Sequence, residues 1–341
     1  MRFPRKLLLI VVGLGVLLGL NQLIEYGAGD FQLNAYYARI INLIGINITL
    51  AVSLNLINGL AGQFSIGHAG FMAVGGYTAT YITVYYGKAI AALVGGSLDG
   101  TGVIPVMLIS LSAGAAAAAA AGLFVGIPSL RLRGDYLAIV TLGFSEIIRV
   151  IILNIPSVGG ATGFTDAIPI TNFFWIYAAA ALTIVIVRNI AASTFGRVLA
   201  TIRGDEIAAE AMGVNTTRYK VLAFVVSAAL AGVAGGLSGQ LFANPLNPQN
   251  LNFVKSIEII VMIVIGGIGS ITGAVFGATA LTVLPEALRS LDQQFPGLRM
   301  VVYAVLLILT MIFRPQGLFG RRELTLPWRR RGAALAGAKL K

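Results

Sequence analysis

The chain contains no cysteine and only one histidine, His68, among its 341 residues. Disulfides, thiolate metal sites and cysteine nucleophiles are therefore excluded, and so is the usual histidine-rich metal cluster. Charged residues are also scarce, at 11%, whereas soluble domains carry about 25%. The sequence has no G-x-x-x-x-G-K-[ST] phosphate-binding loop. We therefore expect this chain to bind no metal or cofactor and to hydrolyse no ATP itself.

Long hydrophobic runs dominate instead, with 57% hydrophobic residues and a mean hydropathy of +0.88. Repeated apolar runs of about 18 residues or more predict transmembrane helices. The sequence thus predicts an all-α polytopic membrane protein whose roughly ten transmembrane helices form one bundle. The predicted spans lie near residues 7–24, 40–59, 66–86, 103–126, 136–153, 173–190, 221–243, 255–268, 273–288 and 299–313.

Basic residues indicate how the spans are oriented. Residues 1–24 resemble a signal peptide, but no A-x-A-like cleavage site follows, so we interpret them as a retained first span. Most of the 24 lysines and arginines fall at the N-terminus, within 131–133 and 188–220, and within 314–341. The positive-inside rule places these segments, and both termini, in the cytoplasm. The net charge of +11 is then explained by membrane topology rather than by nucleic-acid binding.

Glycines recur at helical spacing in the predicted spans. Small residues allow helix backbones to approach closely in lipid, so these pairs indicate tight helix packing, and the alternative is the wall of a transport path. The pairs are Gly122/Gly126, Gly232/Gly236, Gly235/Gly239, Gly269/Gly273 and Gly273/Gly277.

Three pairs of opposite charges lie in or at predicted spans with i, i+3 spacing, which places both members on one helix face. Ionisable groups at membrane depth usually pair or face the bundle interior. The pairs therefore either neutralise each other or line a water-filled pathway or gate. They are Glu146 with Arg149, Lys255 with Glu258, and Glu286 with Arg289.

Two glycine-rich stretches interrupt the apolar pattern, at 58–76 and at 266–273. Non-helical backbone at membrane depth survives only when it is buried in protein or faces a cavity, and broken segments often mark transporter binding sites. A lone histidine is also often only structural, and that alternative remains open for His68. The first break can be broken helix or a re-entrant segment. The candidate pathway residues are Gln63, Ser65, His68, Glu146, Glu258, Gly266, Gly267 and Gly269.

Residues 195–220 form the one long, densely charged stretch inside the apolar chain. Such a stretch cannot lie in lipid, so we expect a cytoplasmic loop between the sixth and seventh spans. Within it, helix formers run from Asp205 to Met212, with Asp205 as a plausible N-cap and Gly213 as a stop signal. The sequence therefore predicts a short helix in this loop.

The predicted helix has two different faces. Ile207 and Met212 form an apolar stripe with two alanines, whereas Glu206 and Glu210 lie on the other face. A helix this short is marginal alone and needs a partner surface. That surface is either the chain's own cytoplasmic ends or a groove on another protein.

These residues carry a family resemblance. The pattern E-x-A-A-E-A-M-G at 206–213, with GR at 196–197 and IRGDE at 202–206, resembles the cytoplasmic coupling loop of ABC importer permeases. Further matching stretches make the chain similar to the LivM-type permeases of branched-chain amino-acid importers over about residues 40–320. Ile207 departs from the strict E-A-A-x-x-x-G form, so the contacts at this position are less defined. The stretches are NLINGLAGQFSIGHAGFMAVGGY at 55–77, LRLRGDYLAIVTLGFSEIIRV at 130–150 and IGGIGSITGAVFGA at 265–278.

The resemblance implies a transport subunit in the inner membrane of a prokaryote. Residues 1–320 would be the permease domain and 321–341 a disordered, basic cytoplasmic tail. Its partners would be a second, LivH-like permease, two ABC ATPase subunits that bind ATP-Mg and dock at 195–220, a periplasmic or lipid-anchored binding protein, and membrane lipid. Glu206 and Glu210 would face basic groups of the ATPase, and the apolar stripe would fill its groove. The implied ATPase-coupling residues are Arg197, Arg203, Asp205, Glu206, Ile207, Glu210, Met212 and Gly213.

Other functions remain as alternatives at this stage. The same kind of machinery can serve urea, amides or other amino acids. A stand-alone carrier could instead couple transport to an ion gradient through the membrane-embedded glutamates. An intramembrane enzyme is disfavoured, because the sequence offers no credible catalytic constellation.

Overall fold

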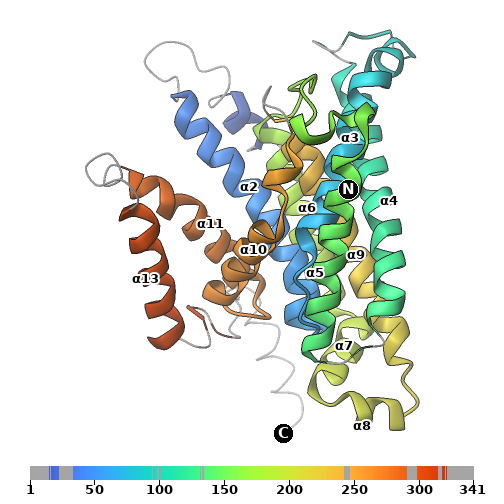
Figure 1. Ribbon diagram of the computed structural model, residues 1–341, viewed down its shortest axis with the longest axis vertical. Coiled ribbons are helices and arrows are strands. Elements are labelled where there is room, and N and C mark those ends of the chain that lie inside the picture. Colours follow the sequence, from blue (N-terminus) through green and yellow to red (C-terminus); the bar gives the residue numbers. More distant parts are fainter. Residues whose placement is uncertain are drawn as a thin grey trace, which may run out of the picture.

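The structure is a computed structural model, and the part of the chain that it describes is almost wholly helical (Figure 1). The only β-type pairing there is an isolated bridge between Phe164 and Leu246. The predicted first span at 7–24 lies mostly outside the described residues, and the predicted tail at 321–341 lies entirely outside them. The described residues are 15, 17–22, 34–93, 95–97, 100, 102–130, 132, 134–241, 246–289, 298–313, 317–318 and 320.

Each predicted span between residues 40 and 313 has a helix at its position, so the prediction of an all-α protein is confirmed. Six helices are long and apolar enough to cross a membrane within the described residues, namely α2 with η2, α4, α5, α6, α9, and η5 with α10. The number of ten spans is not established. The helices are α2 (Ala35–Asn55), continued by the π-helical turn η2 (Leu56–Leu60), α3 (His68–Leu93), α4 (Val103–Ser129), α5 (Asp135–Leu153), α6 (Phe173–Ala192), α7 (Thr194–Gly204), α8 (Glu206–Ala211), α9 (Thr216–Gly239), α10 (Phe253–Gly266), α11 (Ile271–Ala287) and α13 (Leu298–Phe313), with 3₁₀ turns η3 (Pro156–Val158), η4 (Gly160–Thr162) and η5 (Pro248–Asn250).

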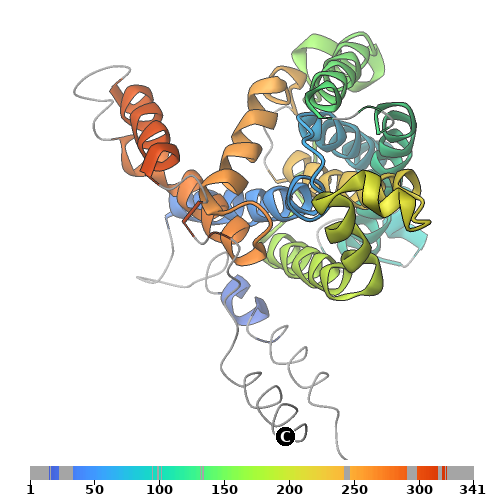
Figure 2. The same ribbon diagram turned by 90° about the horizontal axis from the view of Figure 1, so that it is seen from below.

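The long helices run beside one another as a bundle, and α7 and α8 project at one end of it (Figure 1). Helices α11 and α13 form an arm that extends to one side of the bundle, as the view from below also shows (Figure 2).

Glycine lets α3, α4 and α9 pack closely at the centre of the bundle. A Cβ atom added at Gly114 would lie 2.7 Å from the carbonyl oxygen of Gly75, and one at Gly236 would lie 2.8 Å from Cδ2 of Leu111. A Cβ at Gly235 would collide with the Met72 carbonyl oxygen. Backbones this close require small residues. The glycine pairs on α9 are therefore helix-packing surfaces, as the first of the two interpretations predicts.

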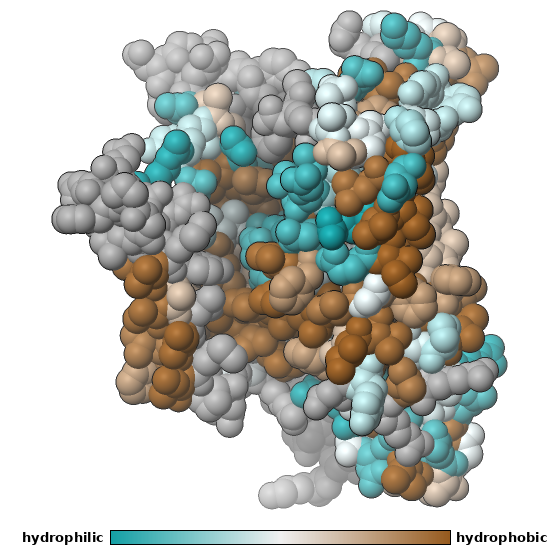
Figure 3. All heavy atoms as spheres, in the orientation of Figure 1, coloured by the Kyte–Doolittle hydropathy of each residue, from teal (hydrophilic) through white to brown (hydrophobic). Residues whose placement is uncertain are grey.

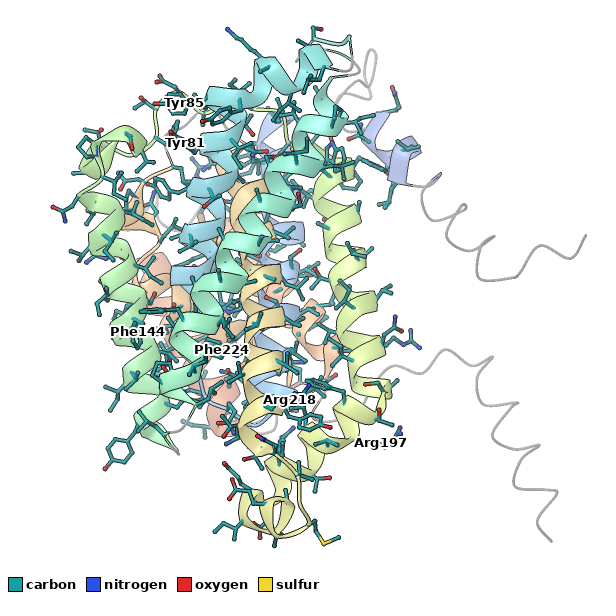
Figure 4. The ribbon with its side chains drawn as sticks, turned by 90° about the vertical axis from the view of Figure 1, so that its right-hand side faces the viewer. Tyr81, Tyr85, Phe144, Arg197, Arg218 and Phe224 are labelled. Carbon is teal, nitrogen blue, oxygen red and sulfur yellow. The ribbon has the colours of Figure 1, made fainter. Side chains whose placement is uncertain are left out.

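The two ends of the bundle differ in their side chains. Arg197 and Arg218 lie at the end that carries α8, whereas Tyr81 and Tyr85 lie at the opposite end (Figure 4). The two tyrosine rings are in contact, with centroids 4.5 Å apart. Basic residues at one end and aromatic residues at the other suit a protein with a cytoplasmic side and an interfacial aromatic belt.

Candidate functional site

The predicted short helix in the charged loop is present as α8. Oδ1 of Asp205 accepts hydrogen bonds from the backbone N–H groups of Ile207 (2.9 Å) and Ala208 (3.0 Å), so Asp205 is the N-cap. Gly213 has a φ of +83°, the left-handed conformation that ends helices and that glycine adopts without strain. Both the start and the stop signals predicted for this helix are confirmed.

The apolar stripe of α8 faces outward. Ile207 is 67% exposed and Met212 is 84% exposed, and Ala208 and Ala211 of the same stripe are exposed as well. Ala209, on the other face, is fully buried. No part of the chain that the structure describes covers the stripe, and the chain's own ends, the alternative partner surface, lie outside the described residues. An apolar surface at the tip of a charged loop is typical of a protein contact.

The acidic face of α8 is turned toward its own chain. Oε1 of Glu206 lies 2.5 Å from Nζ of Lys220, a side chain that is only 1% exposed. Oε1 of Glu210 accepts a 2.8 Å hydrogen bond from the hydroxyl of Thr216. Both glutamates thus hold α8 against the start of α9. The expectation that they face basic groups of a partner stays a prediction.

Helix α7 was not anticipated from the sequence, which predicted only loop before Asp205. Ser193 caps it by accepting a 3.3 Å hydrogen bond from the N–H of Gly196. Leu199 and Ile202 are buried against the bundle. The sequence does contain a signal for α7, because Ser193 is a good N-cap and the apolar positions have helical spacing. The many charged residues of this stretch led to its interpretation as a loop. Arg197, on this helix, points away from the bundle into solvent (Figure 4).

The first glycine-rich break is a non-helical segment, residues 61–67, between η2 and the start of α3. Side chains of other helices accept hydrogen bonds from one residue of this segment and from the first turn of α3. The N–H of Ile66 donates to Oγ1 of Thr141 on α5 (3.1 Å), and the N–H of Ala69 donates to Oγ of Ser256 on α10 (3.0 Å). Such partners are required where no water is present. The predicted non-helical segment is therefore present and is held by packing from three sides.

Ser65 and His68 are almost fully buried in this break, at 1% exposure each. Nε2 of His68 shares a 2.8 Å hydrogen bond with the hydroxyl of Ser53 on α2. Nδ1 of His68 and the hydroxyl of Ser65 have no partner among the described residues. Gln63 is partly exposed and donates a long 3.4 Å bond to the Ala61 carbonyl. Of these pathway candidates, His68 has a structural contact and Gln63 is the more accessible.

The second break lies directly beside the first. Oδ1 of Asn55, on α2, accepts from the N–H of Gly269 (2.8 Å), and its Nδ2 donates to the carbonyl of Ser270 (3.1 Å). Gly267 and Gly269 have φ values of +119° and +92°, so the turn between α10 and α11 requires glycine at both. Gly266 packs directly on the backbone of α11. These three pathway candidates shape a turn. The sequence did not predict that the two breaks touch.

Arg203, in the last turn of α7, reaches the point where the breaks meet. Its Nη1 donates a hydrogen bond to the carbonyl of Gly59 in η2. Its side chain also closes over Gly62, where an added Cβ would lie 2.7 Å from Cγ of Arg203. A Cβ at Gly269 would lie 3.0 Å from Nη1. The loop helix α7 is thus in direct contact with both helix breaks.

The three charged pairs predicted from i, i+3 spacing are all present as ion pairs. The nitrogen–oxygen distances are 2.7 Å for Arg149 with Glu146, 3.0 Å for Lys255 with Glu258, and 4.0 Å for Arg289 with Glu286. Hydrophilic residues gather in the middle of the hollowed face between the α11–α13 arm and the rest of the bundle (Figure 3). Mutual neutralisation is therefore observed, and partial exposure of each pair keeps the pathway interpretation open.

Comparison with known proteins agrees with these features. The family described as "Branched-chain amino acid transport system / permease component" matches residues 36–311. The chain is 33% identical over 328 residues to the high-affinity branched-chain amino acid transport system permease protein LivM of Salmonella typhimurium, covering 85% of this chain and 72% of that protein. The LivM protein of Escherichia coli is 32% identical with the same coverage.

A shorter match links the chain to a second permease type. It is 40% identical over 134 residues to the permease protein LivH of Salmonella typhimurium, covering 39% of this chain and 42% of that protein. Among solved structures, a chain of an ABC transporter in an inward-facing conformation is similar with a TM-score of 0.44 and 17% identity, covering 89% of this chain and 98% of that one. The structural similarity is too low to support an assignment.

Proposed function

The chain belongs to the family of permease components of branched-chain amino acid transport systems, and on this basis we propose that it passes branched-chain amino acids from a binding protein to the cytoplasm by alternating access. It is a multi-pass membrane protein and a transport subunit of an importer. The specific substrate is supported by the LivM relatives, which are branched-chain amino acid permeases and of which the chain covers 72%. The inner membrane, with both termini in the cytoplasm, is the location that suits this function.

The ATP-driven importer in this proposal has four further subunits. A LivH-like permease pairs with this chain, which agrees with the partial similarity to LivH proteins. Two ATPase subunits bind and hydrolyse ATP-Mg, and a periplasmic or lipid-anchored protein delivers the amino acid. This chain itself contributes the path and the docking surface.

The outward-facing apolar stripe of α8 is the observation that carries the docking assignment. Ile207 and Met212 are exposed at the tip of the loop, while the acids of the same helix are bound by their own chain. A short helix that presents apolar anchors suits a hydrophobic groove on a partner. The partner in this proposal is the ATPase, and the stripe rather than the acids makes the contact.

Arg203 connects the docking helix α8 to the membrane-spanning helices. Movement of α8 also moves α7, because only Asp205 separates the two helices. Arg203 on α7 contacts Gly59 in the first break and lies beside Gly269 in the second. In the proposed mechanism, Ser65, His68 and the glycines 266, 267 and 269 form the hinge that Arg203 moves. Glu146 and Glu258 line the path.

Substitution of the stripe tests the proposal. Ile207→Asp with Met212→Asp is expected to lower co-purification of the ATPases and ATP-dependent leucine uptake by roughly tenfold or more. The reason is that two apolar side chains, which the proposed complex would bury against the ATPase, become charged. The measurement uses the complete transporter in proteoliposomes, with uptake of labelled leucine compared with labelled urea. Thr217→Asp, which adds a charge at an exposed site outside the stripe, is the matched control. Full uptake by the double variant would reject α8 as the docking element.

A further inference from the structure

A surface pocket of about 470 Å³ lies between α5 and the segment that leads into α10. Its volume lies within the range of about 300–1,000 Å³ that small-molecule sites occupy. Its α5 residues, Leu142 to Arg149, occupy the middle part of that helix. It is lined by Leu142, Glu146, Arg149, Gln249, Asn252 and Phe253.

Helix α5 supplies one wall of this pocket with a charged pair and an apolar residue. Leu142, Glu146 and Arg149 have i, i+4, i+7 spacing, so they follow one helix face. Arg149 donates from Nε to Oε2 of Glu146 at 2.7 Å. Its two terminal nitrogens have no acceptor among the described residues. A guanidinium with its terminal nitrogens available binds a carboxylate through two parallel hydrogen bonds.

The segment before α10 and the first residue of that helix supply the facing wall. The N–H of Phe253 donates to Oε1 of Glu146 at 3.1 Å, which fixes the carboxylate between the two walls. Each carboxylate oxygen retains a second acceptor site. The side-chain amide of Gln249 has no partner in the part of the chain that the structure describes. Phe253, 41% exposed, adds an apolar surface opposite Leu142.

The charges select the class of ligand. Glu146 and Arg149 form a pair with no net charge, so a ligand with one net charge would leave an unbalanced charge in the pocket, at a substantial cost. A zwitterion carries an opposite charge for each member of the pair and leaves the site neutral. The apolar walls at Leu142 and Phe253 favour a hydrocarbon side chain over a polar one.

We propose that this pocket binds an apolar α-amino acid, with the carboxylate of the ligand on Arg149 and its ammonium group on Glu146. Gln249 offers a further hydrogen bond to the same head group. Urea and simple amides lack both charges and would gain little from the pair. This inference rests on the proposed function, since it supplies that function with a binding site on the permease itself.

The test measures uptake of labelled leucine by the complete transporter in proteoliposomes. Glu146→Gln and Arg149→Gln are each expected to lower uptake by roughly tenfold or more, because a charge-assisted hydrogen bond to the ligand is lost. Arg188→Gln is the matched control, as it removes the charge of an exposed arginine on α6 that lies outside the pocket and should leave uptake unchanged. Gln249→Ala removes only an exposed amide that no other described residue uses, so it is expected to fold normally and to lower uptake by about threefold.

The charge-swapped double variant Glu146→Arg with Arg149→Glu separates a binding role from a structural one. It restores an ion pair on α5. The positions that bind the carboxylate and the ammonium group of the ligand are exchanged, however, while the apolar walls stay in place. Continued loss of uptake, with normal co-purification of the ATPases, is the expected result. Recovery of uptake, or normal uptake by the Arg149→Gln and Gln249→Ala variants, would overturn the pocket assignment. Failure of the unmodified transporter to accumulate leucine with ATP would instead reject the proposed function.

Discussion

At the scale of single residues, Arg203 has a different place from the one that its sequence context suggested. It belongs to a charged cytoplasmic loop, which favoured a contact with a partner protein. In the structure it is partly buried and donates to the carbonyl of Gly59 at a helix break. The planar, multiply donating guanidinium suits such a position between backbone carbonyls better than an ammonium group does.

Replacement of Arg203 by alanine is expected to uncouple ATP hydrolysis from transport. The docking stripe on α8 is untouched, so the ATPases should still co-purify, but the contact from α7 to the breaks is lost. We expect the ratio of leucine transported to ATP hydrolysed to fall by roughly tenfold, in line with the loss of a charge-assisted hydrogen bond.

Two controls accompany this measurement. Arg188→Ala removes an exposed arginine on α6 and should leave the ratio unchanged. Arg203→Lys keeps the positive charge but lacks the planar guanidinium with its several donors, so it should recover only part of the coupling. Loss of ATPase binding by the Arg203→Ala variant would show that the residue acts in docking instead.

At the scale of helices, glycine sets the distance between α9 and α3. Gly235 lies against the backbone of Met72, and Gly232 lies against Gly75. Gly235→Val is expected to lower the free energy of unfolding by about 2 kcal/mol, the usual cost of overpacking. Thermal unfolding of the detergent-solubilised protein measures this effect. Gly143→Ala on α5 is the control, since an added Cβ there meets no atom within 4 Å. Equal midpoints for the two variants would contradict the close approach.

The positions of the helices followed from the sequence more readily than their contacts. Apolar run length placed α10 and α11 within about two residues of the observed bounds. Local capping chemistry placed α8 equally well, because Asp205 and Gly213 act through their own neighbours. The two hydrogen bonds of the Asn55 side chain, to Gly269 and Ser270, join residues that are 214 and 215 positions apart in the chain. No local pattern encodes such a contact.

The candidate site shows the same division between local and long-range features. The i, i+3 spacing was sufficient to predict the ion pair of Glu146 with Arg149. Gln249 and Phe253, which complete the pocket around this pair, come from a different part of the chain and were not predicted. The contact of Glu206 with Lys220 was not predicted either, since a buried partner from the next helix cannot be inferred from α8 alone.

At the scale of the whole molecule, the three membrane glutamates are each paired with a basic residue of their own helix. The importer proposed above takes its energy from ATP on partner subunits, whereas a carrier driven by an ion gradient would need no such partners. We therefore expect this chain, reconstituted alone, to show no leucine uptake driven by a proton or sodium gradient. Addition of the second permease, the ATPases, the binding protein and ATP should be required. Gradient-driven uptake by the single chain would contradict this expectation.

The non-helical segment at 61–67 and the helix start that follows it have a consequence for biosynthesis. The N–H groups of Ile66 and of Ala69, in the first turn of α3, find their acceptors on Thr141 and Ser256, and those bonds span 75 and 187 positions of the chain. The ribosome produces both donors long before either acceptor exists, and lipid offers no substitute. These two bonds therefore form only after α5 and α10 have been made. This junction, although encoded early, is completed only when later helices arrive.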